Sequence, residues 1–257
     1  MRLALHAEWT KLRTAPGTGA LLVVAIVVTV GLGWLASAAV SFQTGGLQDP
    51  VKISLTGVQA GQAIVALFGV LIISGEYSTG LIRTSLAAMP QRWTMLAAKA
   101  VILTGLVLLS GTVAVLGSLF LGRFLLPGNG FSPAHGFTAL SVTDPPTMRA
   151  AAGSVIYLGL IGLLSLGIAT MIRDSAVAVG VVLGMLYLFP IVIQVVADPD
   201  WKQRLEQIAP TNAGLAIQST VDLQSLAISP LMGLGVLAAW ATCALLASAA
   251  ALQLRDA

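Results

Sequence analysis

Long apolar stretches without a charged side chain dominate the pattern of residues along the chain. Six of them run for about twenty residues without Asp, Glu, Lys or Arg: 19–40, 57–75, 100–121, 151–172, 176–196 and 230–252. A helix of about twenty residues crosses the hydrocarbon core of a bilayer, which is about 30 Å thick. The pattern therefore predicts an all-α integral membrane protein in which residues 1–257 form one domain with six transmembrane helices.

The composition excludes several other classes of protein. Hydrophobic residues make up 57% of the chain and charged residues only 9%, whereas an ordinary soluble domain has about 25% charged residues. So few charges cannot cover a soluble surface, which excludes soluble enzymes, nucleic-acid binders and disulfide scaffolds.

The first apolar stretch is longer than the core of a cleavable signal and starts further from Met1, so we interpret it as a retained span.

Charges in the loops predict the orientation of the helices. Six spans place both termini on one side of the membrane, and cytoplasmic loops are enriched in Lys and Arg. The side with the termini carries eight of the 13 basic residues: Arg2, Lys11, Arg13, Arg83, Arg92, Lys99, Arg173 and Arg255. On the opposite side the acidic residues outnumber the basic ones. We therefore expect both termini to lie in the cytoplasm.

The first thirteen residues have an amphipathic pattern. Met1, Leu5, Trp9 and Leu12 share one face of a helix, and basic residues flank that face. This arrangement predicts an interfacial helix on the cytoplasmic surface of the bilayer, with a plain basic tail as the alternative. Pro16 ends the helix before the first span.

A second amphipathic segment follows the second span on the predicted cytoplasmic side. Thr79 lies in a Ser-Thr-Gly sequence that suits a helix cap, and Pro90 ends the segment. Between them, apolar residues recur on one helical face: Leu81, Ile82, Leu86 and Met89. We expect a short helix that is presented to a partner protein or lies on the membrane.

The long connection before the sixth span predicts two short helices on the outer side. Trp201, Leu205 and Ile208 share a helical face, and Pro210 separates them from a second helical segment at 213–226. Helices of this kind cap a bundle or re-enter the membrane surface.

Polar residues inside the spans are few. The apolar stretches hold no Asp, Glu, Lys, Arg or His, which counts against an ion-coupled transporter. Their strongest polar groups are Gln59, Gln62 and Gln194, which either line a polar path or bind a neighbouring helix.

Small residues recur every four positions in two spans and predict contact faces within one chain or between two chains: Ser110, Ala114, Ser118 and Gly122, and Gly235, Ala239, Cys243, Ala247 and Ala251.

The chain has no phosphate-binding loop, because none of its lysines follows glycine and precedes Ser or Thr. A protein of this kind that moves a substrate against a gradient must take its energy from another chain. A cytoplasmic docking element is what such coupling requires.

Three segments carry a resemblance to a known family. The segment Glu8-Trp9-Thr10-Lys11-Leu12-Arg13-Thr14 resembles the amino terminus of type-2 permease subunits of ATP-binding-cassette (ABC) exporters, particularly actinobacterial ones. Residues 75–86, followed by Pro90-Gln91-Arg92, resemble the segment after span two of these permeases. Residues 209–214 resemble the stretch before their span six, and the six-span layout matches over the whole chain.

The resemblance implies a permease of a bacterial plasma membrane without ATPase activity of its own. It implies a lipid-embedded dimer with a second permease copy, driven by two separate ATPase subunits that bind ATP and Mg, while the permease itself holds no cofactor. Its docking contacts with the ATPase map onto Leu5, Trp9, Leu12, Leu81, Ile82, Arg83, Leu86 and Met89.

The resemblance also implies how motion reaches the substrate path. Glu76 and Tyr77 would lie at the inner membrane boundary and couple the ATPase to the spans, unless Glu76 is an ordinary interfacial acid. The path would run mainly between spans two and five, with Pro190 as a hinge.

The apolar spans favour an amphiphilic or hydrophobic substrate, such as an antibiotic, a peptide or a lipid. The alternative function is a non-transport scaffold or signalling subunit that docks a cytoplasmic partner. A passive channel fits less well, because no charged ring or filter motif is present.

Overall fold

The computed structural model describes residues 6, 8–11, 16–42, 48–78, 92–135, 137 and 140–254. This part of the chain is helical with connecting loops and contains no strand. Six spans in it are long and apolar enough to cross a membrane: α2 (Pro16–Ala39), α4 (Val58–Ser78), α6 (Arg92–Leu125), α7 (Pro145–Ile172), α8 to α9 (Ser175–Val195) and α12 (Pro230–Leu254). The predicted all-α fold with six long apolar helices is confirmed, and these helices fit a multi-pass membrane protein.

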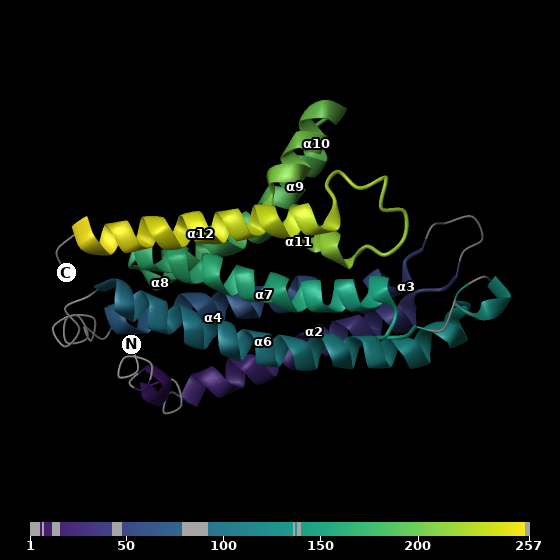
Figure 1. Ribbon diagram of the computed structural model, residues 1–257, viewed down its shortest axis with the longest axis horizontal. Coiled ribbons are helices and arrows are strands. Elements are labelled where there is room, and N and C mark those ends of the chain that lie inside the picture. The colour runs from purple at the N-terminus through teal and green to yellow at the C-terminus, as the bar shows by residue number, and fades with distance from the viewer. Residues whose placement is uncertain are drawn as a thin grey trace.

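The six spans form a bundle with α4 and α7 at its centre (Figure 1). In the most apolar part of α4 and of α7, 61% of the residues are buried, against 17% in α2 and in α12. The outer helices therefore present most of their apolar side chains to lipid or to another chain.

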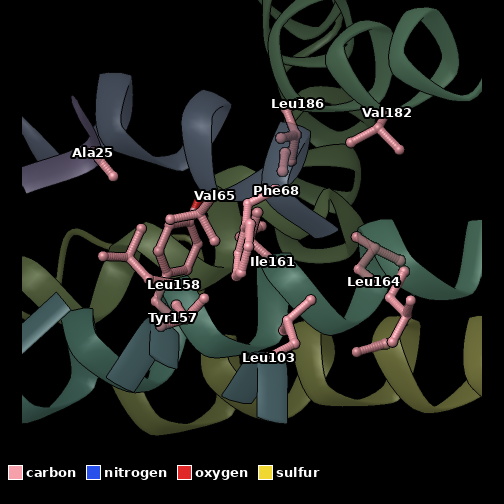
Figure 2. Close-up of a cluster of buried hydrophobic side chains, with 14 of the residues drawn as sticks. Ala25, Val65, Phe68, Leu103, Tyr157, Leu158, Ile161, Leu164, Val182 and Leu186 are labelled. Atoms are coloured by element: carbon pink, nitrogen blue, oxygen red, sulfur yellow. The ribbon is translucent and has the colours of Figure 1, made fainter. Parts of the chain in front are cut away.

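The core lies where α4, α6, α7 and α8 meet (Figure 2). Phe68 of α4, Leu103 of α6 and Ile161 of α7 are all buried there. Gly69 lets α4 approach α7 closely, because a Cβ atom at this position would come within 2.6 Å of the Gly162 carbonyl oxygen. Small residues at helix crossings replace the hydrophobic driving force that helices lack in lipid.

The two rows of small residues have different surroundings. Ser118 of the α6 row is buried beside Gly33 of α2, and Gly122 packs against Ser54. The row in span three is therefore a contact face within the chain. In the α12 row, Cys243 and its neighbours at 235, 239 and 247 are exposed.

Charge-free stretches mark the spans but not the ends of the helices. The predicted third span begins at residue 100, whereas α6 begins at Arg92. Lys99 consequently lies about two turns inside the helix and is 2% exposed, although we expected it in a cytoplasmic loop. A charged side chain does not interrupt backbone hydrogen bonding, so a helix continues through it when the charge finds a partner.

Shorter elements connect the spans. They are α3 (Pro50–Ser54), η1 (Leu126–Asn129), η2 (Pro133–His135), α10 (Pro199–Ile208), α11 (Pro210–Leu215) and η4 (Ala216–Gln218). The structure has the first short helix expected before span six, with Pro210 after its end. The second was predicted at 213–226, whereas α11 and η4 together cover 210–218 and residues 219–226 are not helical. α9 and α10 pack against each other and project away from the long axis of the bundle (Figure 1).

The predicted docking elements fall largely outside the described residues. His6 and residues 8–11 are helical, and Trp9 is 47% exposed. The other predicted docking residues are not among those described: Leu5, Leu12, Leu81, Ile82, Arg83, Leu86 and Met89. Their assignment stays a prediction.

Candidate functional site

A polar cavity of about 370 Å³ enters the bundle between α3, the start of α4, α9, α10 and the α11–η4 segment. We call it the outer pocket, and we call the end of the bundle that holds α3 the outer end, following the predicted orientation. The end that holds Lys99 is the inner end. The polar side chains that line the pocket are Lys52, Thr56, Gln59, Gln194, Glu206, Thr211, Asn212, Gln218 and Ser219.

The outer pocket brings together three of the four residues predicted for the substrate path. Gln59 from span two, and Gln194 and Pro190 from span five, all line it. Neither glutamine side chain is hydrogen bonded within the described part of the chain. Gln62 does not line the pocket, because it lies one turn deeper on α4 and is fully buried.

Beneath the pocket, a buried polar pair joins the two central helices. The Tyr157 hydroxyl of α7 donates a hydrogen bond to Oε1 of Gln62 on α4. The Nε2 atom of Gln62 is buried without a partner among the described residues. An unsatisfied buried amide is costly, so it is a weak point in the packing between α4 and α7.

The wall of the pocket contains a break in span five. The helix changes to a π-helical turn at Gly184–Leu188, where the Phe189 N–H binds the Gly184 carbonyl. Pro190 follows and has no N–H to donate. The carbonyl oxygen of Leu186 is instead bound by the Thr211 hydroxyl at 3.2 Å. The predicted hinge therefore coincides with a π-helical turn, and a side chain of α11 holds it.

A second hydrogen bond ties this break to span two. The hydroxyl of Tyr187, within the π-helical turn, donates to the backbone carbonyl of Gln59 at 2.6 Å. Both of these contacts lie at the border of the outer pocket. Movement of span five at the π-helical turn would therefore change the shape of the pocket.

A carboxylate organises the rim of the outer pocket. Asp49 caps α3 by accepting the Lys52 N–H at 3.1 Å. It also accepts the N–H and hydroxyl of Thr220 and the N–H of Val221, the latter two at 2.8 and 3.2 Å. These bonds connect the segment before span two to the segment before span six. A neighbouring cavity of about 510 Å³ lies on the other side of Lys52 and is lined by Asp49.

A buried ion pair occupies the inner end. Lys99 Nζ of α6 contacts Glu8 Oε2 at 2.6 Å, and both side chains are 2% exposed. The same ammonium donates to the carbonyl oxygen of Ile72 on α4 at 3.3 Å. The amino-terminal helical segment, α4 and α6 therefore meet at one charged point. Lys11, which is 41% exposed, binds the other carboxylate oxygen of Glu8 at 3.0 Å.

The predicted coupling residues Glu76 and Tyr77 lie in the last turn of α4. Their side chains are not among those described, so their role stays a prediction. The helix ends at Ser78, directly before the predicted docking segment.

Several residues of these sites were not predicted from the sequence. Tyr157, Tyr187 and Thr211 are ordinary packing residues by pattern, because a hydroxyl on an apolar helix says nothing about its partner. The sequence predicts Glu8 in an interfacial helix and Lys99 in a cytoplasmic loop, and it does not pair them. Their spacing of 91 residues gave no local signal.

Comparison with known proteins leaves the family open. No family model matches the chain, and no curated protein matches its sequence significantly.

Proposed function

We propose that this chain is the permease subunit of an ABC-type exporter, which moves an amphiphilic or hydrophobic substrate out of a bacterial cell. The outer pocket is the observation that carries the proposal. Polar side chains gather around this cavity at the outer end of a bundle of apolar helices, and the buried Gln62–Tyr157 pair lies one turn of α4 deeper than Gln59, which lines it. A polar cavity next to a buried polar pair suits a substrate path with alternating access, whereas a membrane scaffold has no need of it.

The inner end supports the same function. α4 and α6 flank residues 79–91, the predicted docking helix, and the Glu8–Lys99 pair joins both helices to the amino-terminal segment. A force applied there by an ATPase would act on α4. Because Gln59 at the opposite end of α4 lines the outer pocket, the helix itself provides the mechanical connection.

In this proposal the energy comes from separate ATPase subunits, which bind ATP and Mg. A second permease copy packs against the exposed apolar faces of the outer helices and completes the transporter. The break in span five, with Pro190 at its end, allows the pocket wall to move.

Copurification tests the partner assignment. The full chain is coexpressed with an ABC ATPase encoded beside its gene, and we expect a complex that hydrolyses ATP although the permease alone does not. Leu86→Asp should abolish copurification, because a charge on a buried docking face costs several kcal/mol. The matched control Leu223→Asp, at the outer end, should retain the ATPase. ATP hydrolysis by the permease alone, or a stable complex with Leu86→Asp, contradicts the proposal.

Thiol accessibility separates the exporter from the scaffold. In a Cys243→Ala background, Thr56→Cys in the outer pocket should react with a charged thiol reagent at all times. Ala66→Cys lies one turn below Gln62 on α4 and is buried, so we expect it to react only while ATP is hydrolysed. The control Leu71→Cys should stay unreactive, because this position is exposed on a predicted membrane-spanning helix and we expect lipid to cover it. A scaffold predicts no labelling of Ala66→Cys under any condition.

A further inference from the structure

Two opposite charges line the outer pocket without pairing. Lys52 lies on α3 and Glu206 lies on α10, and both border the same cavity. Neither forms an ion pair within the described part of the chain, so their charged groups do not contact each other. Opposite charges that stay separated across a cavity create a field that favours a ligand with both charges.

Both charged residues lie on elements that are held in place. The carboxylate of Asp49 caps the helix that carries Lys52. Beside Glu206, the side chain of Gln207 donates to the Ala227 carbonyl at 2.7 Å and ties α10 to the segment before α12. The two elements that carry these charges are therefore held at the border of the pocket.

Neutral polar groups complete the lining. The amides of Gln59, Gln194 and Asn212 border the pocket, and none of these side chains is hydrogen bonded within the described residues. Each amide offers donors and an acceptor. Amides and separated charges complement a molecule that carries a cation, an anion and polar groups, and they do not complement a bare hydrocarbon chain.

We propose that the outer pocket binds a zwitterionic group, with the anion of the ligand at Lys52 and its cation at Glu206. A volume of about 370 Å³ holds a small molecule or the polar end of a larger amphiphile. The shared chemistry belongs both to a free amino acid or peptide and to a zwitterionic lipid headgroup. As a statement about the exported substrate this inference rests on the proposed function, whereas binding itself is a property of the chain alone.

Calorimetric titration of the full chain tests the proposal. The protein is purified in an uncharged maltoside detergent and titrated with dialanine, which carries both charges, and with three blocked forms of similar size. N-acetyl-dialanine keeps only the anion, dialanine amide keeps only the cation, and N-acetyl-dialanine amide keeps neither. We expect dialanine to bind about fivefold more tightly than either singly charged form, because each charge contact is partly exposed to water.

Two variants assign the charges. Lys52→Gln should abolish the preference for dialanine over dialanine amide, and Glu206→Gln should abolish its preference over N-acetyl-dialanine. The controls Lys202→Gln and Asp200→Asn change charges on α10 that do not line the pocket, and they should keep the wild-type order. Unchanged thermal unfolding shows that the variants are folded.

A lipid arm identifies the source of the zwitterion. Dihexanoyl phosphatidylethanolamine has both charges and dihexanoyl phosphatidylglycerol has only the anion. If the phosphatidylethanolamine binds more tightly than dialanine, and both pocket variants lose this binding, the ligand is a lipid headgroup. If dialanine binds more tightly than the phosphatidylethanolamine, the ligand is a free zwitterion. The proposal is overturned if neither zwitterion binds better than its singly charged relatives, or if the pocket variants keep the wild-type order.

The titrations use no ATPase, so a negative titration contradicts the zwitterion site and does not contradict the exporter function. A failure to recruit an ATPase contradicts the exporter function and does not contradict the binding result.

Discussion

Two lysines share one carboxylate at the inner end, and we expect their loss to have unequal effects. Lys99 and Glu8 are both 2% exposed, whereas Lys11 is 41% exposed. Replacing either lysine by Met keeps most of the side-chain volume and removes the positive charge. Lys99→Met should destabilise the fold strongly, and Lys11→Met should hardly change it.

The magnitudes follow from burial. Removing one partner of a buried ion pair costs about 3–5 kcal/mol, because the remaining charge is left in a medium of low dielectric. Glu8 keeps Lys11 as a partner, so we expect about 3 kcal/mol for Lys99→Met, at the low end of this range. An exposed pair contributes at most about 1 kcal/mol, which is the limit for Lys11→Met.

Unfolding in mixed micelles with increasing dodecyl sulfate, followed by far-ultraviolet circular dichroism, measures these free energies. The double variant Glu8→Gln/Lys99→Met removes both charges and should cost clearly less than the sum of its single changes. The reasoning is refuted if Lys99→Met and Lys11→Met differ by less than about 1 kcal/mol, or if the double variant is additive.

Three further changes test the packing and the rim of the pocket in the same assay. Gly57→Ala should cost about 1–3 kcal/mol, because its Cβ would overlap a carbonyl oxygen of α2, whereas Gly105→Ala has open space and should be neutral or stabilising. Thr211→Val should cost about 1 kcal/mol in the wild type, because the Leu186 carbonyl loses the Thr211 hydroxyl. In a Pro190→Ala background the cost should be lower, because alanine supplies an N–H for this carbonyl. Equal costs in the two backgrounds would contradict this role of Thr211. Asp49→Asn should cost about 1–3 kcal/mol and speed hydrogen exchange at 219–221, and unchanged exchange would show that the carboxylate does not hold this segment.

The sequence predicted the spans well because their signal is local. An uninterrupted apolar stretch must be buried in lipid or protein, and its length alone decides whether it crosses a bilayer. The ends of the helices were less accurate. A charged residue does not mark the start of α6, because this helix continues through Lys99, whose ammonium contacts Glu8 and the Ile72 carbonyl.

The candidate site was predicted in part. Gln59, Gln194 and Pro190 stand out from their apolar neighbours, and the structure gathers them around one pocket. Gln62 stands out equally but faces Tyr157 instead. Residues three apart on a helix lie on the same side of it, so the sequence does not separate the two glutamines. Gln62 lies one turn deeper on α4, where the hydroxyl of Tyr157 on α7 meets it.

Sequence by itself determined that the chain has six apolar helices long enough to cross a membrane and which polar residues lie inside them, because both follow from the cost of placing polar groups in lipid. Tertiary structure alone decided which of these residues meet. Lys52 and Glu206 come to line the same pocket, and Glu8 pairs with Lys99 at the inner end, although each of these pairs lies far apart in the chain. Which residues meet depends on where the helices cross. Small residues such as Gly69 determine these crossing points, because they let two helix backbones approach each other closely.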